Sequence, residues 1–287
     1  MIKKVLLPGT IIILVFLGVW YIFGGESKCL QTFEPTLAAG PYYNGPLIDT
    51  HVHMPVASKT IKDLSIQAGF EDMPSSSDVS TDYINCLFDA EGIKKAFGFF
   101  IVPKIAPQYV VNYVKNIEEK YPDKFVRVLM PTLPLQTLNP ESSEVEKILN
   151  DNPGLFQGYG EARFDFSLGT NANPEDKYFL EMYRLADKNN LVVQIHPDKG
   201  QLGALKRLLE KYPNVKFLAH VMPYDRSGVG KLMETHKNLY YSLDAEIHYI
   251  FGYQTIQNNR GPTKEEYLKF IRENFDSVLT EALRNWK

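Results

Sequence analysis

Pro46-Leu47-Ile48-Asp49-Thr50-His51-Val52-His53 is the stretch that decides the fold, because it is an apolar, β-forming run that ends in two histidines. Residues i and i+2 of a strand point to the same face. His51 and His53 can therefore bind one metal ion from a single strand, while Val52 faces the other way. A His-x-His pair is common by chance, so the pair alone predicts a metal site only weakly.

Two later apolar runs end in the same way, the first at His196 (191–196) and the second at His220 (215–220). The chain has 6 histidines, and four of them end such runs. In a closed parallel barrel the carboxyl ends of the strands meet at one mouth. Four imidazoles at that mouth predict a site for a divalent metal, most simply Zn²⁺.

The rest of the chain alternates between apolar runs and amphipathic segments, which predicts an α/β fold of parallel strands joined by crossover helices. The predicted strands cover 46–53, 96–102, 125–130, 158–163, 191–196, 215–220 and 239–244. The predicted helices cover 81–91, 107–120, 142–150, 174–189, 202–211 and 263–287. This is the pattern of a (β/α)8, TIM-barrel-like fold with seven strands instead of eight. We interpret the chain as truncated before strand eight, although a segment assigned to a loop could close the barrel instead.

The N-terminus has a different character. Residues 5–23 are uncharged and almost entirely apolar, and Lys3 and Lys4 precede them. About 20 such residues span a bilayer as a helix, so 1–23 is predicted to be a membrane anchor or signal segment, 24–45 a linker and 46–287 the barrel domain. Ile22 and Phe23 suit a cleavage site poorly, which favours an uncleaved anchor. The two lysines favour a cytoplasmic N-terminus, so the domain is expected outside the cytoplasm, in a periplasm or at the cell surface.

The net charge and the cysteines bear on the kind of partner and on the redox compartment. The net charge of −3 gives no reason to expect nucleic acid as a partner. Cys29 and Cys86 are the 2 cysteines, and an oxidising compartment would permit a disulfide between them. We interpret them instead as unpaired thiols, with Cys86 a small buried residue of the predicted helix 81–91.

The three histidine motifs together resemble those of the amidohydrolase superfamily. They are most similar to its amidohydrolase-related branch, which contains metal-dependent hydrolases and decarboxylases, and the resemblance covers about residue 46 to the end. It implies a distorted (β/α)8 barrel with the metal at the C-terminal mouth. By motif, His51, His53 and His196 would be metal ligands, and His220 would bind a second metal or contact substrate. Many members add an aspartate at the end of strand eight as ligand and general base, and no residue of this chain matches it.

Glu161, at the end of predicted strand 158–163, is the fifth candidate ligand. The resemblance allows two roles for it, because a strand-four carboxylate contacts the metals in TatD-type nucleases but only shapes the pocket in many mononuclear members. Arg163 shares its face and could hold a substrate carboxylate or form a structural ion pair. Asp49 shares the face of His51 and could orient a ligand histidine.

The positions of three further residues along the chain predict where they lie relative to the barrel mouth. His248 comes after strand 239–244 and could line the substrate pocket. His236 comes before that strand, at the end away from the mouth, and is expected at the surface. Asp244 could be a ligand, but an aspartate at a strand end often only caps the next helix.

The resemblance implies a metal-dependent hydrolase that uses a metal-activated water on a small ester, amide or lactone. The expected cofactor is a divalent metal, with Zn²⁺ favoured, and the expected partners are a small-molecule substrate and a membrane. Two alternatives stay open: a decarboxylase with the same site, and a membrane-tethered binding module without catalytic activity. The sequence does not indicate an oligomeric state.

Overall fold

The computed structural model describes residues 29, 47–55, 63, 80–131, 139–164, 173–197, 200–220 and 226–242. Within these ranges seven parallel strands form one sheet whose spatial order follows the chain, from β1 to β7. The strands are β1 (Leu47–His53), β2 (Ile93–Ile101), β3 (Phe125–Met130), β4 (Gly158–Arg163), β5 (Val192–His196), β6 (Lys216–Ala219) and β7 (Leu239–Tyr241). The result is an incomplete parallel barrel, as the strand count predicted.

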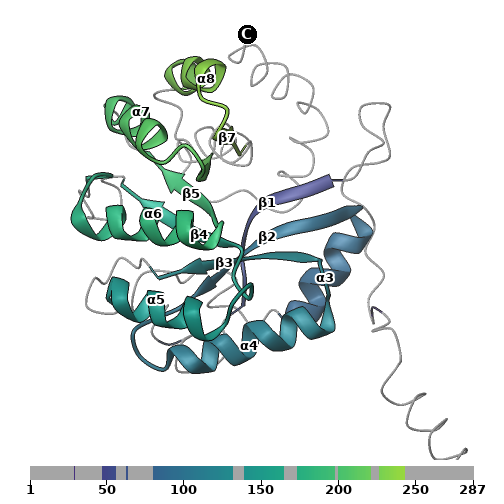
Figure 1. The fold of residues 1–287 in the computed structure, drawn as a ribbon. Helices are drawn as coiled ribbons and strands as arrows, with labels where there is room; N and C mark the ends of the chain where they lie inside the picture. Colours follow the sequence, from purple (N-terminus) through teal and green to yellow (C-terminus); the bar gives the residue numbers. More distant parts are fainter. Residues whose placement is uncertain are drawn as a thin grey trace, which may run out of the picture.

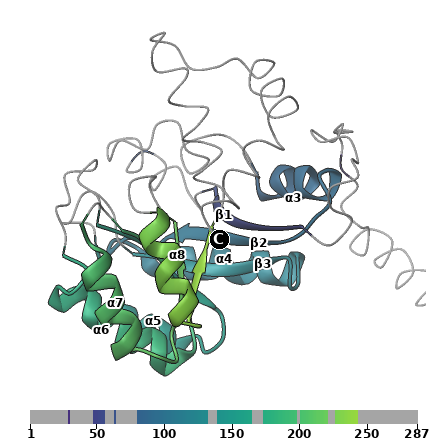
Figure 2. The ribbon, with the colours of Figure 1, turned by 90° about the horizontal axis from the view of Figure 1, so that it is seen from above.

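Helices connect consecutive strands and follow one another in an arc around the sheet (Figure 1), and Figure 2 shows the same arrangement from above. They are α3 (Thr81–Ala90), α4 (Pro107–Lys120), α5 (Ser142–Asp151), α6 (Lys177–Asn189), α7 (Leu202–Lys211) and α8 (Arg226–Thr235). Local sequence explains their ends. Ser80 caps α3 by accepting a hydrogen bond from the Tyr83 N–H, and Pro107 occupies the first turn of α4.

The central strands, β2 to β6, bury both faces along most of their length, as parallel strands do. On β2 and β3, Phe99, Ile101, Val128 and Met130 form a small inner cluster. The residues that alternate with them, such as Phe100 and Leu129, belong to the larger cluster beneath the helices. This alternation turns one face of each strand toward the barrel interior, where polar side chains are found on β1, β4 and β5 in place of the inner cluster.

Helix α8 was absent from the sequence-based prediction. Its sequence contains Gly228 and Gly230, and glycine disfavours a helix by about 1 kcal/mol relative to alanine. Packing explains one of the two, because a Cβ at Gly228 would overlap the side chain of Leu202 on α7. The close approach of α7 and α8 therefore favours a residue without a side chain at this position.

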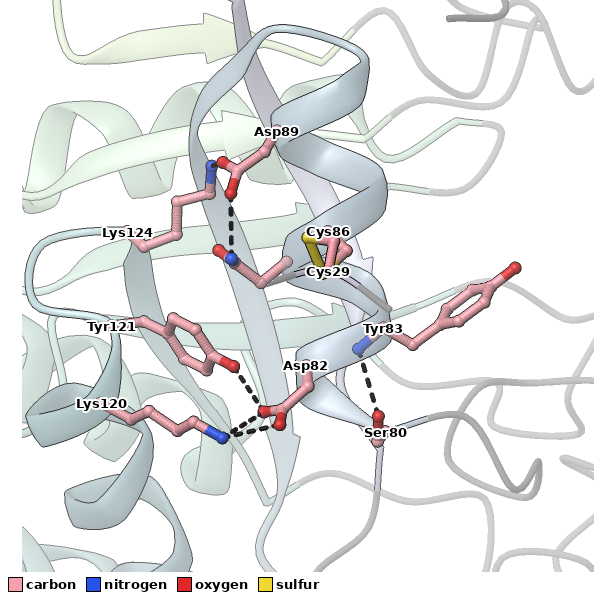
Figure 3. Close-up of a disulfide and its surroundings, with 10 residues drawn as sticks. Cys29, Ser80, Asp82, Tyr83, Cys86, Asp89, Lys120, Tyr121 and Lys124 are labelled. Atoms are coloured by element: carbon pink, nitrogen blue, oxygen red, sulfur yellow. Dashed lines mark hydrogen bonds and ion pairs between the residues drawn. A yellow bond between two sulfur atoms is a disulfide. The ribbon is translucent and has the colours of Figure 1, made fainter. Parts of the chain in front are cut away.

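The interpretation of the cysteines as unpaired thiols was wrong. Cys29 and Cys86 form a disulfide with their Cα atoms 5.6 Å apart, and it links the segment before β1 to α3 (Figure 3). Cys86 is only partly buried and Cys29 is exposed, so Cys86 is not the core residue that its apolar neighbours suggested. The same helix is held to α4 by Asp82, which accepts a hydrogen bond from Lys120 at 2.6 Å and another from Tyr121.

Several predicted segments fall outside the described residues. They are the anchor at 1–23, the linker at 24–45 apart from Cys29, and the last predicted helix at 263–287. In the ranges that the structure does describe, the helices are too short or too polar for any of them to cross a bilayer. The domain boundaries and the membrane anchor remain predictions.

Candidate metal centre

Four histidines and one glutamate, contributed by four strands, meet at the carboxyl ends of the strands. Glu161 of β4 is at the centre of this group. One carboxylate oxygen, Oε2, lies 3.8 Å from His51 Nε2 and 3.6 Å from His53 Nε2. The other, Oε1, lies 3.9 Å from His196 Nε2 and 3.6 Å from His220 Nδ1. All five sequence-predicted metal ligands therefore lie together.

The five side chains form two overlapping ligand groups. We call His51, His53 and Glu161 the first ligand group, and Glu161, His196 and His220 the second. In each group the potential ligand atoms lie within 4.8 Å of one another. Imidazole nitrogen and carboxylate oxygen are the donors found in catalytic zinc sites, so both groups fit a divalent ion, and Glu161 is common to both.

Glu161 is buried, with 2% of its surface exposed. Burial acts to raise the pKa of the Glu161 carboxyl group, but the imidazoles of His220 and His53 outweigh it, with further help from the charge on His51. The net effect holds this pKa well below its ordinary range. The carboxylate therefore stays ionised at neutral pH and places a buried negative charge where a cation would bind.

Gly160 allows β4 to place this carboxylate. Its φ of 149° is in the region that favours glycine, and a Cβ there would lie 2.7 Å from the backbone oxygen of Gln194 on β5. The register between β4 and β5 shifts at this point, between Tyr159 and Ala162. Those two side chains pack in the outer core, while Glu161 turns inward to the histidines.

The β1 histidines are held by their neighbours. Asp49 Oδ1 accepts a hydrogen bond from the His51 backbone N–H at 2.9 Å, so Asp49 supports the backbone of the predicted ligand. The buried ring of Phe99 on β2 lies edge-on to the His51 ring at a centroid distance of 4.8 Å, and 5.8 Å from the His53 ring. Phe99 forms an apolar wall beside the first ligand group.

Sequence reasoning missed Phe99 and Gln194. Gln194 lies two residues before His196 and is 1% exposed, so it faces the same interior. The period of two along a strand was the available signal for it, since a polar residue at that spacing from a predicted ligand points the same way. Phe99 carried no such signal, because it lies within the continuous apolar run of β2.

The other residues predicted for the site lie partly or wholly outside the described structure, or away from the two ligand groups. Arg163 pairs in register with His196 at the end of β4, and its side chain is outside the described part of the structure. His248 and Asp244 also lie outside it. His236 follows α8, where its Nδ1 lies 3.1 Å from the Leu232 carbonyl oxygen, and it takes no part in either ligand group.

Neither protein-family models nor curated protein sequences match the chain. Among solved structures, YJJV, a TatD homolog from Escherichia coli K12, matches with a TM-score of 0.51 and 14% identity, over 83% of this chain and 95% of that one. An amidohydrolase from Burkholderia multivorans with bound HEPES gives a TM-score of 0.48 at 10% identity, over 84% and 81%. An uncharacterized TIM-barrel protein from Bordetella bronchiseptica gives 0.43 at 14% identity, over 83% and 99%.

The similarity to the TatD homolog shows a shared fold. The predicted barrel-type fold is thereby confirmed, and similarity at this level of identity shows the fold alone.

Proposed function

We propose that the protein is a metal-dependent hydrolase of the amidohydrolase-related type that acts on a small ester, amide or lactone. The observation that carries this proposal is the meeting of His51, His53, His196 and His220 around the buried carboxylate of Glu161. Imidazoles and a carboxylate brought together from four strands at the carboxyl end of a barrel are typical of a catalytic site. The fold shared with the TatD homolog supports the same class.

The residues fit one or two divalent ions, with zinc as the expected metal. The first ligand group would hold an ion with two nitrogens and one oxygen, and the second group offers the same donor set. When bound, such an ion polarises a substrate carbonyl oxygen and lowers the pKa of a water molecule toward neutrality. Glu161 supplies the negative charge that either ion requires.

The low pKa of Glu161 also limits its role in proton transfer. A general base works best with a pKa near the working pH, and the pKa of Glu161 lies well below that. Because Glu161 lies between the imidazoles of both ligand groups, we assign it the role of a shared ligand and fixed negative charge. The buried ring of Phe99 puts apolar surface beside His51 and His53, and a lower local dielectric strengthens electrostatic interactions.

We also propose that the domain functions outside the cytoplasm. The Cys29–Cys86 disulfide supports this location, because disulfides form and persist in oxidising compartments. The apolar segment 5–23 provides a candidate anchor or export signal. A thiol count on protein taken directly from the native compartment tests it: no reactive thiol is expected, and two free thiols would contradict it.

Metal analysis of the purified, oxidised protein tests the central proposal. The wild-type protein is expected to retain a divalent metal through dialysis, and His53→Ala is expected to lose it. His236→Ala is the matched control, because His236 is also a partly buried histidine but hydrogen-bonds to the α8 backbone. Absence of any bound or bindable metal, or equal loss in both variants, would refute the assignment.

Product analysis then identifies the reaction. A panel of esters, lactones and amides should give hydrolysis that depends on the metal. Aromatic acids form a second panel, because the same ligands can hold a substrate carboxylate and support decarboxylation. Release of CO₂ without hydrolysis would favour the decarboxylase, and metal binding without turnover on either panel would favour a binding module.

A further inference from the structure

Gln194 connects two strands that are not neighbours in the sheet. Its side chain points into the barrel from β5 and is 1% exposed. Its Nε2 donates a hydrogen bond to the backbone carbonyl oxygen of Thr50 on β1, at 3.3 Å. Because β1 and β5 are separated by three strands in the sheet order, this hydrogen bond crosses the barrel interior.

The peptide group that accepts this bond is the one before His51. The register of β1 against β2 shifts between Asp49 and Val52, so this peptide lies at an irregular point of the ladder. Side chains hydrogen-bond to it on both sides. The His51 N–H donates to Asp49 Oδ1 at 2.9 Å, and the Thr50 carbonyl accepts from Gln194. Loss of one such hydrogen bond from a partly buried peptide group costs about 1 kcal/mol.

The backbone of Gln194 also borders the residue that places Glu161. The carbonyl oxygen of Gln194 occupies the space where a Cβ of Gly160 would lie, at 2.7 Å. Two residues further along β5 is His196, a member of the second ligand group. A single residue thus contacts the backbone next to His51 and the glycine next to Glu161, and it precedes His196 on the same strand.

We propose that Gln194 is a positioning residue that sets His51 at the correct distance from Glu161 and His196. It acts through the Thr50–His51 peptide and belongs to neither ligand group. This inference rests on the proposed function, in that its effect on the metal presupposes a metal site. The carbonyl hydrogen bond itself is independent of any ligand.

Gln194→Met tests the proposal, because methionine keeps the length of the side chain and removes the donor. In the metal-free protein, hydrogen exchange of the His51 amide, followed by NMR, is expected to become at least tenfold faster. The dissociation constant for Co²⁺ is expected to rise at least tenfold, with a changed visible absorption spectrum. Gln194→Asn keeps the amide but is one methylene shorter, and it is expected to act in the same direction if the methionine variant fails to fold.

Asn238→Ala is the matched control. The Asn238 amide holds the backbone elsewhere, by donating to the carbonyl oxygens of Leu209, Tyr212 and Val215. It should lower the stability of the metal-free protein but leave the His51 exchange rate and the Co²⁺ dissociation constant unchanged.

Three outcomes would overturn the positioning role. They are an unchanged exchange rate at His51 in the Gln194 variants, an unchanged dissociation constant, and equal effects in Asn238→Ala. A wild-type protein that binds no Co²⁺ would instead refute the proposed function. Faster exchange at His51 in the same variants would then still show that Gln194 holds this peptide.

Discussion

Thr50 and Ser242 join the two edge strands of the sheet. Their hydroxyl oxygens lie 2.7 Å apart, although 192 positions separate them in the sequence. Thr50 belongs to β1, and Ser242 follows β7 and continues its pairing by donating its N–H to the Ala219 carbonyl at 2.9 Å. The sheet is therefore drawn together at the ends of the strands where the candidate metal centre lies, even though β1 and β7 form no ladder with each other.

Thr50→Val and Ser242→Ala are each expected to lower the free energy of unfolding by about 1 kcal/mol, because each leaves the other hydroxyl with one partner fewer. The double variant should cost less than the sum of the two. Urea unfolding of all four proteins, analysed as a double-mutant cycle, measures this coupling. Strictly additive losses would mean that the hydroxyl contact does not stabilise the fold.

Gly160→Ala is expected to destabilise the protein by about 1–3 kcal/mol and to weaken metal binding. The added Cβ would lie 2.7 Å from the Gln194 backbone oxygen, on a backbone conformation that favours glycine. Because Gly160 precedes Glu161, the strain would displace the carboxylate. Urea unfolding and metal titration report the two effects.

Gly154→Ala provides the matched control for Gly160→Ala. Gly154 also has a positive φ, of 76°, but no atom lies within 4 Å of the position of an added Cβ. It should cost only about 1 kcal/mol of backbone strain and leave metal binding intact. Metal binding lost to the same degree in both variants would show that Gly160 has no special part in placing Glu161.

Loss of the disulfide is expected to lower stability substantially. The Cys29–Cys86 bond joins residues 57 positions apart, and the chain-entropy estimate for a loop of this length is about 4 kcal/mol. The Cys29→Ser/Cys86→Ser double variant should therefore unfold at markedly lower urea concentration than the oxidised wild type. Wild-type protein reduced with dithiothreitol should match the variant, and a difference between them would point to an effect of the substitutions themselves.

Asp82 is expected to make the free energy of unfolding decrease at acid pH. Its hydrogen bond from Lys120, and then that from Tyr121, lowers the pKa of the Asp82 carboxyl group below the ordinary value of about 3.9. A depressed pKa in the folded state stabilises the protein above that ordinary value, and the contribution is lost as the pH falls through the folded-state pKa.

Asp82→Asn should accordingly be less stable than wild type at pH 6–7, and the difference should shrink below about pH 4. The Asp82 and Lys120 side chains are 50% and 49% exposed, so solvent screening limits the effect to about 1 kcal/mol or less. Thermal unfolding across this pH range measures it. A difference that grows toward acid pH would contradict the sign of the pKa shift.

Regular alternation made much of the fold predictable. The predicted strand 125–130 and helices 107–120 and 202–211 coincide with β3, α4 and α7. The grouping of the candidate ligands was predictable for a related reason: a parallel barrel brings strand ends together, so His51, His196 and His220 could be placed side by side without knowledge of any contact. Glu161 was identified in the same way, from its position at the end of a strand.

Features that depend on a specific long-range contact were not predictable. Cys86 has an apolar sequence context, and only the folded chain shows that it faces Cys29. The contact between Thr50 and Ser242 depends on how the sheet curves, which no local pattern encodes. Helix α8 was not predicted because Gly228 lowers the local helix propensity. The same glycine lets α8 pack closely against Leu202 of α7.

The bond between Cys29 and Cys86 turns the stretch of chain between them into a covalent ring, and β1 with its two histidines is part of that ring. A protease that cuts once anywhere between the two cysteines therefore cannot release either fragment. The nicked protein would migrate as a single species on a non-reducing gel and separate into two only after a thiol is added.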